Sequence, residues 1–236
     1  MSVSIGKIAR IGALATVAGL IFALVLYNVS FKPPEPAQVW DERTVIGSLD
    51  AKHHYVMYTD LMCPYCDVFS RLLMENEEIF KRDYIEGRNI VFEVRVTDFL
   101  YEYSSHRPEA SRLSAEATYC ATNAGRFWDY YHAALAALWE DYHSKGIGVS
   151  AGSPLITDMT ADYWLEVGRD IGLGEDFERC YTEHEALGQV EENTKLASAK
   201  VDGGLPYFKF GSFMTSGFDQ GWGWEYVRRY LDAGLK

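Results

Sequence analysis

Two cysteines of this chain are spaced for dithiol chemistry. Cys63 and Cys66 enclose Pro64 and Tyr65, between a strand-like segment that ends at Thr59 and a helix-like segment that starts at Pro64. The helix dipole and the free backbone N–H groups at a helix N-terminus stabilise a thiolate, and proline fits the first helical position. The second sulfur follows one turn later, close enough to form a disulfide. The motif predicts thiol–disulfide exchange, with Cys63 as the attacking thiol and Cys66 as the more buried, resolving thiol.

A Cys-x-x-Cys motif can also belong to a zinc site or a structural disulfide. Zinc needs a second pair of ligands at similar spacing, whereas Cys120 and Cys180 stand alone and only His184 follows Cys180 closely. A structural disulfide across two residues would close too short a loop to stabilise the fold much. We therefore expect neither a metal nor a cofactor.

The N-terminal segment predicts where the rest of the chain resides. Residues 11–29 are uncharged and as a helix would span roughly 28 Å, close to the thickness of a bilayer. Lys7 and Arg10 precede them, which favours a cytoplasmic N-terminus, and the bulky exit residues favour a retained anchor over a cleaved signal peptide. We expect a single-pass cell-membrane protein whose catalytic domain is extracytoplasmic. The expected parts are a cytoplasmic N-terminus (1–10), a transmembrane anchor (11–31) and a proline-rich tether (32–40).

Beyond the tether, strand-like and helix-like patterns alternate. Their order is β, α, β, a helical block, then β, β, α, which predicts an α/β fold with a helical insertion. We expect strands at 44–48, 55–59, 89–99, 207–210 and 213–214, and helices at 64–82, 109–123, 126–139, 161–171, 176–182, 185–200 and 222–231.

Charge excludes one class of partner. The net charge is −12, from 22 basic and 34 acidic side chains among 236 residues. Nucleic acids require clustered lysine and arginine, so no nucleic-acid partner is expected.

Several motifs together resemble a known family. Residues 58–66 (YTDLMCPYC), 201–208 (VDGGLPYF) and 115–139, with Cys120-Ala121 and a Gly-Arg-Phe-Trp run, are similar to DsbA-type thiol–disulfide oxidoreductases. The resemblance covers residues 38–236. It implies a thioredoxin-fold domain formed by 41–100 and 201–236, with a helical insertion at 101–200.

The resemblance also implies a substrate site and partners. Leu205-Pro206 would be a cis-proline pair beside the disulfide, where an incoming extended peptide pairs with the exposed edge at Leu205. The implied activity introduces disulfides into unfolded or reduced secreted proteins, and a membrane-embedded, quinone-linked thiol oxidase would accept the electrons. A disulfide reductase or isomerase, or a redox-inert peptide-binding module, remains an alternative.

Two positions depart from the family pattern. Met57 stands where members commonly have an acidic residue near the buried thiol, which leaves Asp60 and Glu93 as candidates for proton transfer. Tyr65 stands where strongly oxidising members often have histidine, which predicts a less oxidising disulfide.

The two remaining cysteines predict a structural disulfide. Cys120 and Cys180 lie on helix-like segments of the same block, in a chain expected to face an oxidising compartment. The alternative is a pair of buried free thiols that pack as small apolar side chains.

Overall fold

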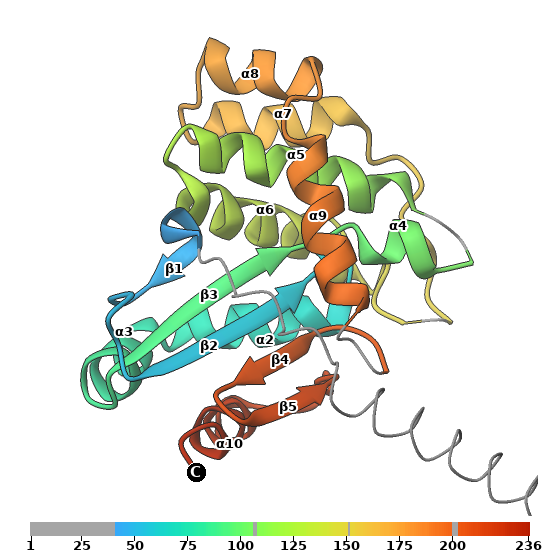
Figure 1. Cartoon of the computed structure of the whole chain (residues 1–236). Helices are drawn as coiled ribbons and strands as arrows, with labels where there is room; N and C mark the ends of the chain where they lie inside the picture. The colour runs from blue at the N-terminus through green and yellow to red at the C-terminus, as the bar shows by residue number, and fades with distance from the viewer. Residues whose placement is uncertain (1–40, 106–107, 151, 200–202) are drawn as a thin grey trace, which may run out of the picture. The chain divides into compact units, whose positions relative to one another are not determined.

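A mixed five-stranded sheet forms the centre of the fold (Figure 1). The computed structural model describes residues 41–105, 108–150, 152–199 and 203–236. The strands lie in the order β1 (Val45–Ile46), β3 (Ile90–Val96), β2 (His53–Thr59), β4 (Tyr207–Phe210) and β5 (Phe213–Ser216). β2 and β3 are parallel, and the other neighbouring pairs are antiparallel.

The alternation of side chains along β2 divides the core between the two faces of the sheet. Tyr55 and Met57 face α2 (Pro64–Glu75) and α10 (Trp224–Ala233), whereas Val56 and Tyr58 pack with residues of α9 (Leu187–Ser198). All seven residues of β3 are buried, which fits a parallel strand covered on both faces.

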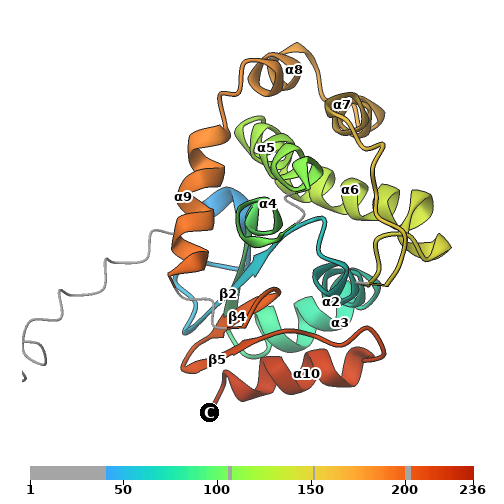
Figure 2. The ribbon, with the colours of Figure 1, turned by 90° about the vertical axis from the view of Figure 1, so that its right-hand side faces the viewer.

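Most of the described chain between β3 and β4 is helical. In both views α7 and α8 lie farthest from the sheet, with α5 and α6 between them and the strands (Figures 1 and 2). A disulfide between Cys120 and Cys180, as expected from the sequence, joins α5 to α8 with a Cα–Cα distance of 5.7 Å. These helices are α4 (Phe99–Tyr103), α5 (Glu109–Asn123), α6 (Phe127–Asp141), α7 (Ala161–Asp170), α8 (Glu175–Thr182) and α9.

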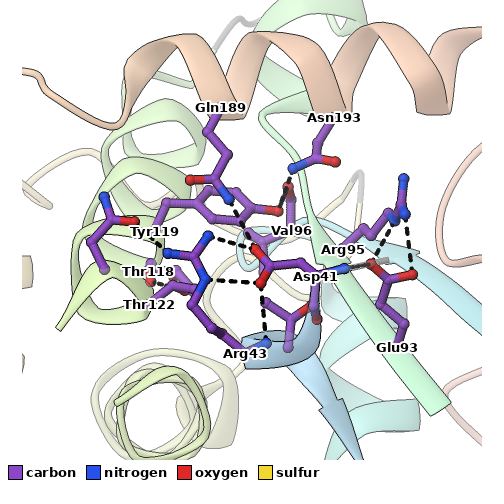
Figure 3. Close-up of polar contacts among 12 residues, drawn as sticks. Asp41, Arg43, Glu93, Arg95, Val96, Thr118, Tyr119, Thr122, Gln189 and Asn193 are labelled. Atoms are coloured by element: carbon purple, nitrogen blue, oxygen red, sulfur yellow. Dashed lines mark hydrogen bonds and ion pairs between the residues drawn. The ribbon is translucent and has the colours of Figure 1, made fainter. Parts of the chain in front are cut away.

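Hydrogen bonds connect this helical region to the sheet (Figure 3). Tyr119 of α5 donates its hydroxyl hydrogen to the carbonyl of Val96 at 2.9 Å, and Asn193 of α9 donates to the Tyr119 oxygen at 2.8 Å. The helical region and β3 are therefore tied together from inside the core.

Several boundaries differ by a few residues from the sequence expectation, and two of these differences have a visible cause. The strand expected to reach Phe99 ends at Val96, because the N–H of Asp98 bonds to the Thr194 hydroxyl at 3.0 Å instead of continuing the sheet, and Phe99 begins α4. The single helix expected at 64–82 is interrupted at Asn76, whose side chain donates to the carbonyl of Leu72 at 2.9 Å. Beyond Asn76 the chain continues as α3 (Glu77–Phe80) and a π-helical turn, η2 (Lys81–Glu86).

The expected membrane anchor belongs to a part of the chain that the structure does not describe. Residues 11–31 and the tether at 32–40 lie outside the described residues. Among the residues that are described, no helix is both long enough and apolar enough to cross a bilayer.

Candidate active site

Cys63 occupies the N-cap position of α2, where the sequence placed it. Pro64 is the first helical residue, and the N–H of Asp67 bonds to the carbonyl of Cys63 at 3.0 Å to close the first turn. Only 4% of Cys63 is exposed, whereas Tyr65 beside it is 40% exposed. The first sulfur thus lies just beneath the surface, at the positive end of a twelve-residue helix.

The loop before β4 lies against this sulfur. The Leu205–Pro206 peptide bond is cis, as expected, and the Cys63 thiol donates a hydrogen bond to the Leu205 carbonyl with an S–O distance of 3.7 Å. Gly203 and Gly204 adopt φ values of 105° and 113°, a backbone region that favours glycine. Two segments 142 positions apart therefore meet at Cys63.

Cys66 lies deeper, with 1% of its surface exposed. Burial raises the pKa of its thiol well above the ordinary value, and the neighbouring Cys63 raises it further. The Thr59 hydroxyl and the backbone at Asp60 act in the opposite direction as hydrogen-bond partners that lower this pKa. Cys66 is therefore held as a neutral thiol, and its use as a nucleophile requires a proton acceptor.

Asp60, one of the two acids expected to take part, is fully buried beneath the motif. Its carboxylate accepts hydrogen bonds from the N–H groups of Met62 and Leu100, both at 2.9 Å, and from the hydroxyl of Ser111 at 2.6 Å. Burial raises its pKa to about 6, although these hydrogen bonds lower it in part. Asp60 thus holds the turn before Cys63 against α4 and α5.

Glu93, the other expected acid, is engaged in an ion pair beside the sheet. It pairs with Val56 across the sheet, so it lies on the face opposite α2. There it accepts hydrogen bonds from Arg95 at 3.0 and 3.1 Å and from the N–H of Asp41 at 3.3 Å (Figure 3). Glu93 is therefore a partner in a buried ion pair with Arg95.

A second buried acid was not found by sequence reasoning. Asp67 follows Cys66 directly, and one of its carboxylate oxygens lies 3.0 Å from Nδ1 of His143. Each side chain is 1% exposed. Because the two residues are 76 positions apart, no motif spacing shows the pair; the only sequence signal was an acid beside the second cysteine.

This pair borders a pocket that begins at the motif. The pocket has a volume of about 370 Å³. Its wall includes Pro64, Asp67, His143, Arg71, Glu75, Trp139, Gln220 and Trp222. Among the described residues, no cluster of three or more histidine, cysteine or acidic side chains is placed to hold a metal ion.

The fold and the cysteine geometry together define a class of protein. A helix-capping cysteine, a second cysteine one turn later and a cis-proline loop against the first sulfur suit exchange of thiols and disulfides on a thioredoxin-like sheet. The family model described as thioredoxin matches residues 40–204. The chain belongs to the thioredoxin family, and its fold is that of the DsbA-like thiol–disulfide oxidoreductases.

Solved structures share this fold at low sequence identity. A thioredoxin-like oxidoreductase from Silicibacter pomeroyi DSS-3 is 19% identical, with a TM-score of 0.56 over 82% of this chain and 92% of that chain. The thiol–disulfide exchange protein alpha-DsbA2 from Wolbachia pipientis is 17% identical, with a TM-score of 0.55 over 80% and 86%. Oxidised BdbD from Bacillus subtilis is 17% identical, with a TM-score of 0.57 over 81% and 92%. No curated protein matches the sequence.

Proposed function

We propose that this protein introduces disulfides into secreted or membrane proteins by dithiol–disulfide exchange through Cys63 and Cys66. The observation that carries the proposal is the contact between the Cys63 sulfur and the backbone of Leu205, at 3.7 Å. Cys63 lies at the N-terminus of α2, and the loop at Leu205 offers backbone groups to an extended substrate beside that sulfur.

The exchange proceeds in two steps that conserve atoms and electrons. A substrate thiolate attacks the Cys63 sulfur of the Cys63–Cys66 disulfide, forms a mixed disulfide and releases Cys66 as a thiolate, which takes up a proton. A second substrate thiolate attacks the substrate sulfur of the mixed disulfide and releases Cys63. The substrate loses two electrons and gains a disulfide, and the protein ends as a dithiol.

An extracytoplasmic location is part of the proposal. Structural disulfides persist in oxidising compartments, and the Cys120–Cys180 bond supports such a location for the folded domain. The anchor at 11–31 and tether at 32–40 would then hold the domain at the outer face of the membrane. Fractionation of cells, followed by N-terminal sequencing of the mature protein, tests this: a soluble product that starts near residue 30 contradicts a retained anchor.

The partners follow from the direction of electron flow. Reduced or unfolded secreted proteins would supply electrons, and a membrane-embedded, quinone-linked thiol oxidase would remove them from the Cys63–Cys66 dithiol. Thiol–disulfide exchange itself needs no metal or other cofactor.

Oxidative refolding tests the activity and its direction. The oxidised full-length protein is mixed with a reduced, unfolded substrate that contains several cysteines, and formation of substrate disulfides is followed with time. We expect Cys63→Ser to abolish the reaction and the Cys120→Ala/Cys180→Ala control to retain it. Rearrangement of scrambled disulfides without net oxidation would instead indicate an isomerase, and no exchange at all would indicate a redox-inert module.

A further inference from the structure

The buried Cys66 thiol requires a group with which it exchanges its proton. Cys66 becomes a thiolate each time the disulfide opens, and it must lose a proton each time the disulfide re-forms. Asp60 and Glu93 are poorly suited to this exchange. Three donors already occupy the Asp60 carboxylate, and Glu93 is already paired with Arg95.

Three buried hydroxyl groups, those of Thr59, Tyr131 and Ser70, lie in a row that begins at Cys66. The Thr59 hydroxyl is a side-chain hydrogen-bond partner of both Cys66 and Tyr131 and lowers the pKa of each. The Tyr131 hydroxyl in turn lies 2.7 Å from the hydroxyl of Ser70. All three of these side chains are at least 98% buried. They form a polar path that starts at Cys66 inside an otherwise apolar core.

The Asp67–His143 pair lies beside this path. The negative charge of Asp67 raises the pKa of Tyr131, as does that of Cys66, so the phenol lies within electrostatic reach of both groups. Ser70 follows Asp67 by three residues on α2, a spacing that makes side chains neighbours on a helix. The second Asp67 oxygen and Nε2 of His143 are buried and have no hydrogen-bond partner among the described residues. An unpaired buried polar atom costs free energy, so its presence in a folded protein calls for an explanation, and a functional role is one.

We infer that Asp67, together with His143, exchanges the proton of Cys66 through the hydroxyls of Thr59, Tyr131 and Ser70. The inference rests on the proposed thiol–disulfide exchange. When Cys66 leaves as a thiolate, Thr59 donates a proton to it and is reprotonated along the path, with the Asp67–His143 pair as the source. Formation of the disulfide runs the same transfers in reverse. The Ser70 hydroxyl completes the path when it rotates toward the unpaired Asp67 oxygen.

The pocket beside the motif supplies the connection to solvent. Asp67 and His143 both line it, so the proton that the pair gives up can be replaced from water there. The other charged groups on its wall are Arg71 and Glu75, which form an ion pair with each other at 3.2 Å. Glu75 is 57% exposed at its side chain and therefore provides a matched carboxylate on α2 outside the path.

When glutathione disulfide oxidises the reduced full-length protein, Cys63 and Cys66 react in two successive steps that can be measured separately. Attack by Cys63 depends on the concentration of glutathione disulfide, whereas the subsequent attack by Cys66 on the Cys63–glutathione mixed disulfide does not. Acid quenching and mass spectrometry follow both species over a range of pH. We expect Asp67→Asn to slow the Cys66 step about tenfold or more near pH 7 and to move its pH profile upward, while the Cys63 step is unchanged.

Two further variants make the outcome decisive. Tyr131→Phe removes the middle hydroxyl but leaves the Asp67–His143 pair, and it should produce the same defect; Glu75→Gln should produce none. An unchanged Cys66 step in both Asp67→Asn and Tyr131→Phe overturns the inference, as does equal slowing of both steps, which indicates a merely structural effect. If the wild-type protein forms no mixed disulfide at all, the proposed function fails as well.

Discussion

The hydroxyl of Ser111 donates a 2.6 Å hydrogen bond to the carboxylate of Asp60, and both groups are completely buried. This bond joins the turn that precedes Cys63 to the first long helix of the insertion. The position of the reactive sulfur therefore depends on a carboxylate whose pKa burial raises to about 6, from an ordinary value of 3.8.

This raised pKa predicts a specific pH dependence of stability. Between these two pH values the folded protein binds the Asp60 proton and the unfolded chain does not, so stability falls as the pH rises. Relative to Asp60→Asn, the wild-type protein should lose about 3 kcal/mol of unfolding free energy between about pH 3.5 and 7. Urea denaturation at several pH values measures this difference. Asp176 is a surface carboxylate that is 86% exposed, so Asp176→Asn should leave the pH dependence of the unfolding free energy as in the wild type. If the unfolding free energies of wild type and Asp60→Asn change in parallel with pH, the prediction is wrong.

The two active-site thiols should differ in reactivity. Burial keeps the pKa of Cys66 high, whereas Cys63 caps α2 and is a little more exposed. Iodoacetamide at pH 7 should therefore label Cys63 of the reduced protein first, as mapped by mass spectrometry. Cys66→Ser should be labelled as fast as wild type and Cys63→Ser far more slowly; the reverse order would exchange the two roles.

Loss of the Cys120–Cys180 disulfide should destabilise the domain without abolishing exchange. The bond closes a loop between cysteines 60 positions apart. For a loop of this length the chain-entropy model gives a stabilisation of the folded state of about 4 kcal/mol. We expect Cys120→Ala/Cys180→Ala to lower the free energy of unfolding by this order of magnitude in guanidinium denaturation. Cys63→Ala/Cys66→Ala keeps the bond and serves as the control. A loss below about 1 kcal/mol would show that packing alone holds α5 to α8.

Substitution by alanine should have different effects on stability at two helical glycines. A Cβ atom at Gly168 of α7 would lie in contact with the ring of Phe177, so close that the ring must shift. Gly168→Ala should cost about 1–3 kcal/mol through overpacking. Gly188 of α9 is exposed and has open space around it, so Gly188→Ala should be neutral or stabilise by up to about 1 kcal/mol. Equal thermal shifts for the two variants would contradict this account of the α7–α8 contact.

The sequence predicted the elements whose chemistry is local. The Cys63–Cys66 spacing, the proline at the first helical position and the glycines before Pro206 each carry a signal within a few residues. The sequence favoured a Cys120–Cys180 disulfide over two free thiols, because both cysteines lie in one helical block of a chain expected to face an oxidising compartment; the structure contains this bond.

Contacts between distant polar residues were not predictable. The Asp67–His143 pair depends on how α6 ends and where the following turn packs against α2, which no periodicity determines. In the same way, β3 ends at Val96 and not at Phe99 as expected, because the N–H of Asp98 bonds to Thr194, which is 96 positions away. Tertiary packing decided each of these outcomes.

The reduction potential of the Cys63–Cys66 couple tests the central claim most directly. The reduced and oxidised forms of the full-length protein are equilibrated with glutathione buffers of known ratio and are quantified after trapping of free thiols. An oxidase of substrate thiols requires a potential above about −200 mV, nearer to protein disulfide isomerase at about −180 mV than to thioredoxin at about −270 mV. We predict a value above about −200 mV; a value at or below about −250 mV would contradict disulfide introduction and indicate a reductase.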